Sequence, residues 1–439
     1  MFSLAIMQNR LFKLMTSMIF LSWINQLFFI LKGGIMSIFL SLFIIFTCGI
    51  LGGILFEKIK LPKLVWYIIL GIFIGPSVLN IVDDTLINIS SYLRQIALVI
   101  ILTRSGLSLD IHNLKKIGRP AIFMCFLPAV FEIVGIAIFA PIFLGISYLE
   151  ALLLGSVLAA VSPAVVVPRM IKLMDEGYGM EHNVPELIMA GASCDDIFVI
   201  VLFYSFKSLV ATSNFQAWDI AQIPISIVGG VFLGIVVGFF IVLILHKLKM
   251  NKVIHVIFML GASFGMIALE SALKPYFSIS SLLAIIVMAL IVHIFKREEA
   301  KDIQKTYNSL WSGFEILLFT LVGIATDIHY AFSIEGAILI GIVLIALVFR
   351  SIGVFVSLIA TKFNKKEKLF IILSYLPKAT VQASIGAIAL QEGLGCGTVV
   401  LTGAVISILI TAPLGAILMD RTYKKLLNPK EEIEINLNN

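Results

Sequence analysis

Residues 188–201 read IMAGASCDDIFVIV and place two adjacent carboxylates, Asp195 and Asp196, in the middle of an apolar segment. On insertion scales, a carboxylate at the centre of a membrane-spanning helix costs about 3 kcal/mol, so two together cost roughly twice that. A purely structural role rarely justifies such a cost. The stretch therefore predicts a transmembrane helix with a functional site at its centre.

The composition of the whole chain is typical of a membrane protein. Of its 439 residues, 60% are hydrophobic and 13% are charged, and the mean hydropathy is +1.08. A soluble domain of this length would carry far more polar surface. The net charge of +6 does not indicate nucleic-acid binding, because the basic residues are spread over short loops between apolar runs. The four cysteines have no paired spacing, so neither disulfides nor a zinc site are expected.

Fourteen apolar stretches are long enough to cross about 30 Å of hydrocarbon. We therefore expect an all-α polytopic membrane protein with about fourteen transmembrane helices. No small-residue cleavage site follows the first stretch, so residues 1–35 are predicted to hold an extra N-terminal helix, before a membrane domain at 36–420 and a cytoplasmic tail at 421–439. The predicted spans are 11–31, 36–56, 63–82, 90–108, 119–146, 149–172, 184–208, 221–246, 252–272, 279–295, 310–327, 335–361, 367–393 and 398–420.

The distribution of lysine and arginine predicts the orientation of these helices. If both termini are cytoplasmic, 25 of these residues fall in inside segments and only three, Lys32, Lys207 and Lys274, fall in outside loops. The other four lie within helices or at their ends. Positively charged residues accumulate in cytoplasmic loops, so this split supports the count of spans and predicts cytoplasmic termini.

An internal repeat relates the two halves of the chain. GLSLDIH at 106–112 resembles GIATDIH at 323–329, and each stretch ends a predicted helix. Counted from the aspartate in each copy, an ionisable residue follows 22 positions later in the first and 23 positions later in the second. These residues are Glu132 and Arg350, which therefore occupy equivalent positions with opposite charge.

Each copy continues into a helix that proline is expected to interrupt at mid-membrane. Pro163 lies in VSPA at 161–164, and Pro377 lies in LPKAT at 376–380. Seven helices separate the aspartates of the two copies, and an odd number means that the copies enter the membrane from opposite sides. Inverted repeats with broken helices at matching positions are typical of alternating-access secondary transporters.

The aspartate pair suits competition between a proton and a cation. Helix neighbours point about 100° apart, so one aspartate can face an ion path while the other meets a partner charge. Burial in a poorly hydrated cavity favours the protonated carboxylic acid. Such a group holds either a proton or a small hard cation, which is the simplest basis for antiport.

The helix breaks supply further oxygen ligands and compensating charges. Backbone carbonyls lose their helical partners at a break, and Ser162 and Thr380 add hydroxyl oxygens there. Lys378 is predicted to neutralise the C-terminal ends of the half-helices. Arg350, which cannot deprotonate in a protein, is predicted to form an intramembrane ion pair with Glu132.

At these residues the sequence resembles the monovalent cation:proton antiporter-2 superfamily, specifically the NHA-type sodium/proton exchangers. The resemblance covers roughly residues 36–420 and is sharpest at VSPAVVVP (161–168), the Asp195-Asp196 pair and LPKATVQA (376–383). It implies a homodimer with a dimerisation part and a mobile six-helix core, interleaved in sequence. It also implies that Asp195 and Asp196 bind the exchanged ions where two unwound helices cross.

The sequence departs from the family pattern at one charge. Strongly electrogenic bacterial relatives usually pair a lysine with the first aspartate, whereas here Arg350 holds the matching helix position, with Glu132 as a second partner. This departure leaves the proton:cation ratio open.

The resulting prediction is a Na⁺ (or Li⁺)/H⁺ antiporter that works by an elevator-like movement. Asp196 is the expected main ligand of the transported cation and Asp195 the second carboxylate. We expect no enzymatic activity and no cofactor, a bacterial inner-membrane location, lipid contact and no nucleic-acid partner. One alternative is sodium-coupled symport of an organic anion, which needs a wider polar cavity. The other is an intramembrane aspartyl hydrolase, which the adjacency of the two aspartates disfavours.

Overall fold

The computed structural model describes residues 37–109, 118–211, 217–247, 251–273 and 279–429. Within them every regular element is helical, and an isolated antiparallel bridge between Tyr178 and Pro429 is the one β contact found there. The helices are α2 (Ile38–Lys58), α3 (Lys63–Ile74), α4 (Asp84–Ser108), α6 (Arg119–Met124), α7 (Leu127–Leu144), α8 (Tyr148–Leu158), α9 (Pro163–Asp175), α10 (Val184–Ala211), α11 (Ala217–Lys247), α12 (Lys252–Leu273), α13 (Ser281–Phe295), α14 (Arg297–Ala325), α15 (Ile328–Ala331), α16 (Ile334–Ser357), α17 (Lys365–Ser374), α18 (Thr380–Ile385), α19 (Ile388–Gln391) and α20 (Gly397–Leu426).

Ten segments of the described chain are long and apolar enough to cross a membrane, which confirms a multi-pass, all-helical architecture. The predicted count of about fourteen is not reached by this criterion. Two predicted spans, 63–82 and 279–295, are the shorter helices α3 and α13, and the span 367–393 is divided into α17, α18 and α19. The first predicted span, 11–31, lies outside the described residues.

Two helix boundaries that differ from the predicted spans have local causes. Helix α3 ends at Ile74 because the next residues are Gly75 and Pro76, and the residue before a proline is disfavoured in the α conformation. Helix α14 begins at Arg297 rather than near residue 310. Its charged first turns remain helical because Ala300, Ile303 and Tyr307 bury one face.

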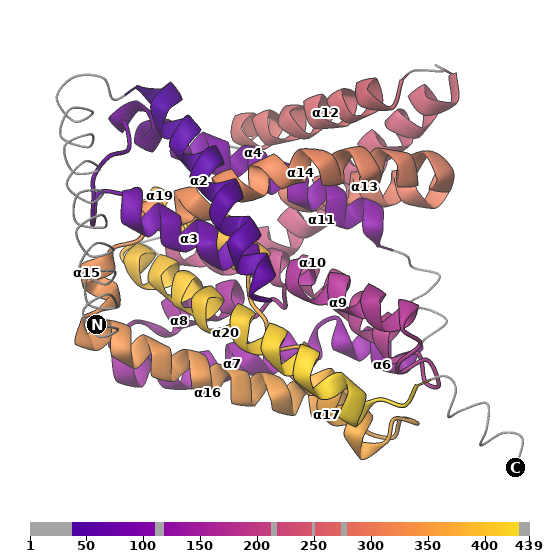
Figure 1. Ribbon diagram of the computed structural model, residues 1–439. Coiled ribbons are helices and arrows are strands. Elements are labelled where there is room, and N and C mark those ends of the chain that lie inside the picture. Colours follow the sequence, from indigo (N-terminus) through magenta and orange to yellow (C-terminus); the bar gives the residue numbers. More distant parts are fainter. Residues whose placement is uncertain (1–36, 110–117, 212–216, 248–250, 274–278, 430–439) are drawn as a thin grey trace, which may run out of the picture.

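The helices run roughly side by side across the view of Figure 1, with α20 passing obliquely in front of them. Helices α7 and α16 pack together at one edge, while α11 packs on α13 and α14 packs on α3 and α4. Helix α10 packs against both α8 and α9 and also contacts α17 and α18. The helix with the aspartate pair is therefore held among the segments that were predicted to be broken.

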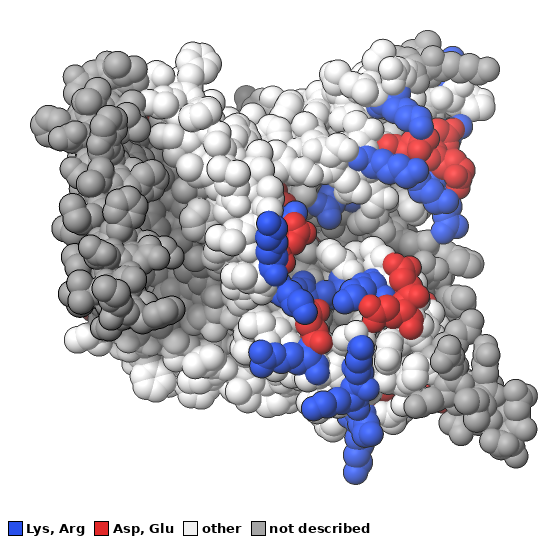
Figure 2. Space-filling model, viewed as in Figure 1, with Lys and Arg blue, Asp and Glu red and all other residues white. Residues whose placement is uncertain are grey.

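Charged side chains gather at one end of this bundle. Figure 2 shows them on the right half of the view, near ends of α9, α14, α17 and α20, beside a broad white surface over α2 and α3. The pairs there include Arg169–Asp420, Lys172–Glu176 and Lys252–Asp302. All these residues come from segments predicted to lie on the cytoplasmic side.

Many large apolar side chains are exposed along the bundle, while others form its buried core. Phe39, Phe232 and Phe332 are 78%, 68% and 86% exposed. Such a surface suits contact with lipid hydrocarbon, because exposing this much apolar area to water is unfavourable. The internal repeat stays a prediction, since residues 110–112 of its first copy lie outside the described residues.

Candidate functional site

The structure places Pro163 and Pro377 at two helix interruptions that contact each other. Helix α8 ends at Leu158 and α9 begins at Pro163, while α17 ends at Ser374 and α18 begins at Thr380. The backbone N–H of Ser162 donates to the carbonyl of Pro377 at 2.8 Å. The two unwound segments thus meet, and they bring together backbone groups that no longer have helical partners.

Arg350 of α16 neutralises the carbonyl ends of both broken helices. Its Nε donates to the carbonyl of Tyr375 at 2.6 Å, and its Nη1 donates to the carbonyl of Ala159. These two residues are the C-caps of α17 and α8. The prediction had given this role to Lys378. Arg350 has it because a guanidinium offers five donors in a fork, which can reach two carbonyls and two carboxylates at once.

Four buried charges form a balanced network around Arg350. Its Nη2 lies 2.7 Å from Asp195 Oδ2, and its Nη1 lies 2.9 Å from Glu132 Oε2. Lys378 Nζ reaches the same Glu132 oxygen at 2.5 Å. All four side chains are at most 1% exposed. Two cations therefore match two carboxylates, and no net charge remains within this group.

Asp196 is a buried carboxylate that does not take part in this network of ion pairs. It follows Asp195 in α10 and is 6% exposed. No lysine or arginine in the described part of the chain lies within ion-pair distance of it; Arg350 and Arg104 interact with it only at longer range. The offset between helix neighbours explains how Asp195 turns toward Arg350 while Asp196 does not.

Three buried side-chain oxygens of α10 and the first break have no hydrogen-bond partner among the described residues. They are Oδ1 of Asp195, Oδ1 of Asp196 and Oγ of Ser162. The second oxygen of Asp195 is fully used, since it also accepts the backbone N–H of Val161 at 2.8 Å. Carboxylate and hydroxyl oxygens are suitable ligands for a small hard cation. Thr380, at the start of α18, is also buried at the second break.

Three residues that the sequence reasoning did not single out also hold the breaks in place. Gln382 donates to the carbonyls of Leu158 and Ala160 at 3.3 and 2.8 Å. Thr411 of α20 accepts the backbone N–H of Lys378 at 2.8 Å. The amide of Gln382 in an apolar run was a detectable signal, whereas Thr411 resembles any other hydroxyl in a membrane helix.

Tyr375 is the third of these residues, and it packs between Arg350 and α10. The guanidinium lies over its ring, 5.5 Å from the centroid. Its hydroxyl lies directly over Gly191, where a Cβ atom would overlap it. Gly191 is one helical turn before Asp195, so the absence of a side chain there allows Tyr375 to approach the aspartate helix.

The sequence of this chain is similar to those of known sodium/hydrogen exchangers. The sodium/hydrogen exchanger family, transmembrane region, matches residues 42–421. Human sodium/hydrogen exchanger 9B2 is 35% identical over 406 residues, covering 89% of this chain and 75% of that protein. Human sodium/hydrogen exchanger 9B1 is 33% identical over 405 residues, covering 88% and 78%.

The fold also matches a solved structure. The sodium proton antiporter MjNhaP1 from Methanocaldococcus jannaschii superposes with a TM-score of 0.75 at 20% identity, covering 88% of this chain and 97% of that chain. None of these proteins supports the alternatives of organic-anion symport or intramembrane hydrolysis. The predicted resemblance to a cation:proton antiporter family is confirmed, and this chain belongs to the sodium/hydrogen exchanger family.

Proposed function

We propose that this chain exchanges Na⁺ or Li⁺ for protons across a membrane, with Asp196 as the main cation ligand and Asp195 as the second carboxylate. The observation that carries this proposal is the charge balance at the helix breaks. Glu132 and Asp195 are matched by Arg350 and Lys378, whereas Asp196 is buried without a paired cation. One monovalent charge, either a proton or an alkali cation, completes the balance.

The same balance supports exclusive binding. A buried carboxylate without a counter-charge is unfavourable, so the site is stable when it holds a proton or a cation and unfavourable when it holds neither. It has little capacity for both, because the second positive charge would be unpaired. Each crossing of the membrane therefore carries either a proton or a cation, and crossings with both or with neither are unfavourable, which is the requirement for exchange.

The finer organisation follows from the same proposal. We infer about fourteen spans with inverted repeats, an extra helix within residues 1–35, a tail at 421–439, and a core that moves like an elevator against a dimerising scaffold. Contact between the two broken helices supports a compact mobile core. The charge that gathers near the end of α20 in Figure 2 supports a cytoplasmic location of the C-terminal end. We infer a cytoplasmic N-terminus from the distribution of lysine and arginine along the sequence. We place the chain in a bacterial inner membrane as a homodimer surrounded by lipid.

The decisive test is Asp196→Asn in proteoliposomes that report Na⁺-driven proton movement. Exchange should fall to the background of empty liposomes, because the amide cannot carry the exchanged charge. The thermal stability of the variant should equal or exceed that of the wild type, because an unpaired buried charge is removed.

Asp84→Asn is the matched control, since Asp84 is exposed in the first turn of α4. It should exchange at the wild-type rate. Wild-type exchange by Asp196→Asn would refute the assignment of the site. Symport would be indicated instead if Na⁺ entry required an added organic anion.

A further inference from the structure

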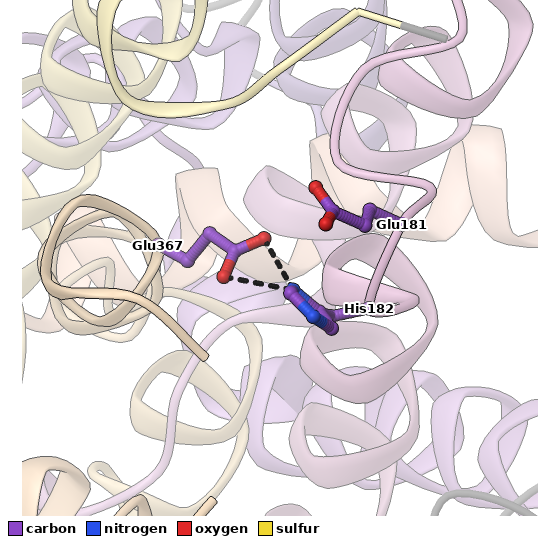
Figure 3. Close-up of side chains that lie close together, drawn as sticks. All are labelled: Glu181, His182 and Glu367. Atoms are coloured by element: carbon purple, nitrogen blue, oxygen red, sulfur yellow. Dashed lines mark hydrogen bonds and ion pairs between the residues drawn. The ribbon is translucent and has the colours of Figure 1, made fainter. Parts of the chain in front are cut away.

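A second group of ionisable side chains lies apart from the exchange site, where the connection between α9 and α10 meets the first turn of α17 (Figure 3). Glu181 and His182 belong to the connection, and Glu367 belongs to α17. One potential ligand atom from each residue lies within 4.8 Å of the other two. Figure 3 shows the Glu367 carboxylate facing the His182 imidazole, with the Glu181 carboxylate nearby but joined to neither.

Two of the three side chains are held in place. Glu367 is 3% exposed, and both of its carboxylate oxygens lie 3.0 Å from His182 Nδ1. One of these oxygens also accepts the backbone N–H of Asn364 at 2.8 Å as part of a capping box. The His182 ring packs edge-on against Phe363. Two ligand groups are therefore positioned before any ion binds.

The charges of the group do not balance. Two carboxylates face one imidazole, which neutralises at most one of them even when it is protonated. In the described part of the chain, Glu181 accepts a hydrogen bond from the Asn428 amide at 3.5 Å. Among the described residues, no lysine or arginine forms an ion pair with Glu181 or Glu367. The group therefore keeps a net negative charge, which favours the binding of a divalent cation.

We propose that Glu181, His182 and Glu367 bind a divalent first-row transition metal, for which Zn²⁺ is the probe. A combination of imidazole and carboxylate ligands suits these metals, whereas Mg²⁺ and Ca²⁺ prefer oxygen alone. Three protein ligands leave the fourth tetrahedral position to water.

The geometry needs only a small adjustment. Tetrahedral zinc with bonds of about 2.0–2.1 Å brings its ligand atoms to roughly 3.4 Å from each other. Glu367 and His182 are already closer than that, and the exposed Glu181 can move inward. The bound metal would join the end of the connection after α9 to the start of α17, and so stabilise the charged end of both broken helices. This site does not depend on the proposed exchange activity, because it shares no residue with it.

The test is titration of the full chain, purified in detergent and stripped of metal, with Zn²⁺ in a calorimeter and in a thermal unfolding assay. The wild type should bind one ion and unfold at a higher temperature with Zn²⁺. His182→Ala should lose about tenfold or more in affinity and most of the thermal shift. His329→Ala is the control, because His329 lies in α15, on the side of the membrane opposite to the predicted cytoplasmic loops. This variant should bind Zn²⁺ like the wild type.

A gain-of-affinity variant guards against misfolding as an explanation. Glu181→His replaces a mobile carboxylate with a second imidazole and should bind Zn²⁺ more tightly than the wild type. Glu181→Gln should bind it more weakly. Glu367 is left unchanged because it also caps α17. Equal Zn²⁺ affinity in the wild type, His182→Ala and Glu181→His would overturn the proposal, as would a wild type without saturable binding.

Discussion

The ion pairs at the helix breaks and those at the charged end of the bundle use the same residue types in opposite surroundings. At the breaks, the side chains of Glu132, Asp195, Arg350 and Lys378 are at most 1% exposed. At the charged end, Lys172 and Glu176 form an ion pair of 3.6 Å with side chains 61% and 36% exposed.

The difference shows where charge decides the structure. Removing one partner of a buried pair leaves an uncompensated charge and costs about 3–5 kcal/mol, whereas an exposed pair contributes about 0–1 kcal/mol. The buried network must therefore remain complete for the breaks to keep their arrangement. The exposed pairs only add charge to a surface that water already stabilises.

The largest effect is expected for Arg350→Met. The change leaves Asp195 and Glu132 with Lys378 as their one cation and removes the donors to the carbonyls of Ala159 and Tyr375. We expect a loss of about 3–5 kcal/mol in stability, measured by thermal or denaturant unfolding in detergent, and no exchange. Arg350→Lys should recover only part of this loss, because an ammonium lacks the planar fork. A fully stable Arg350→Met protein would remove the distinction between the two regions.

A smaller effect is expected for Gly191→Ala. The new methyl group would overlap the hydroxyl of Tyr375, and overpacking of this kind costs about 1–3 kcal/mol. Unfolding of the single variant should be compared with that of Gly191→Ala/Tyr375→Phe. Removal of the hydroxyl should restore part of the stability, because the new methyl group would still lie 2.9 Å from Met124 Cβ. Gly313→Ala is the control, since a Cβ at Gly313 has no atom within 4 Å. Equal stability of Gly191→Ala and Gly313→Ala would contradict the packing argument.

The charge balance itself can be tested by neutralising first one carboxylate of the network and then one cation as well. Glu132→Gln leaves two cations for Asp195 and Asp196, so Asp196 should need the exchanged cation less. We expect the apparent Na⁺ affinity to fall about tenfold, on the order of 1.4 kcal/mol. Glu132→Gln/Lys378→Gln restores the original net charge and should recover much of this affinity. The measurement is the Na⁺ dependence of exchange in liposomes, and additive losses in the double variant would argue against charge balance.

The smallest effect is expected at the charged end. Lys172→Gln breaks the exposed pair with Glu176 and should change stability by less than about 0.5 kcal/mol. Exchange in liposomes should remain at the wild-type rate. A loss comparable to that of Arg350→Met would show that the exposed pairs also maintain the structure.

The intramembrane charges and the two breaks could be predicted because each violates the pattern of an apolar helix. Asp195, Asp196, Glu132 and Arg350 are conspicuous in apolar runs, and proline lacks the backbone donor that a continuous helix needs. The role of Lys378 could not be predicted, because its side chain can reach either the carbonyl ends or a carboxylate from the same backbone position.

The sequence by itself determined that this chain crosses a membrane many times, where its helices are interrupted, and which charges lie within the apolar region. These properties are local, because they depend on runs of neighbouring residues. Only the tertiary structure decided which charges pair. Arg350 meets Asp195 from 155 positions away and Glu132 from 218 positions away. Two cations can pair with three carboxylates in several ways, and the packing of α7, α10, α16 and the two breaks selects the arrangement that leaves Asp196 unpaired.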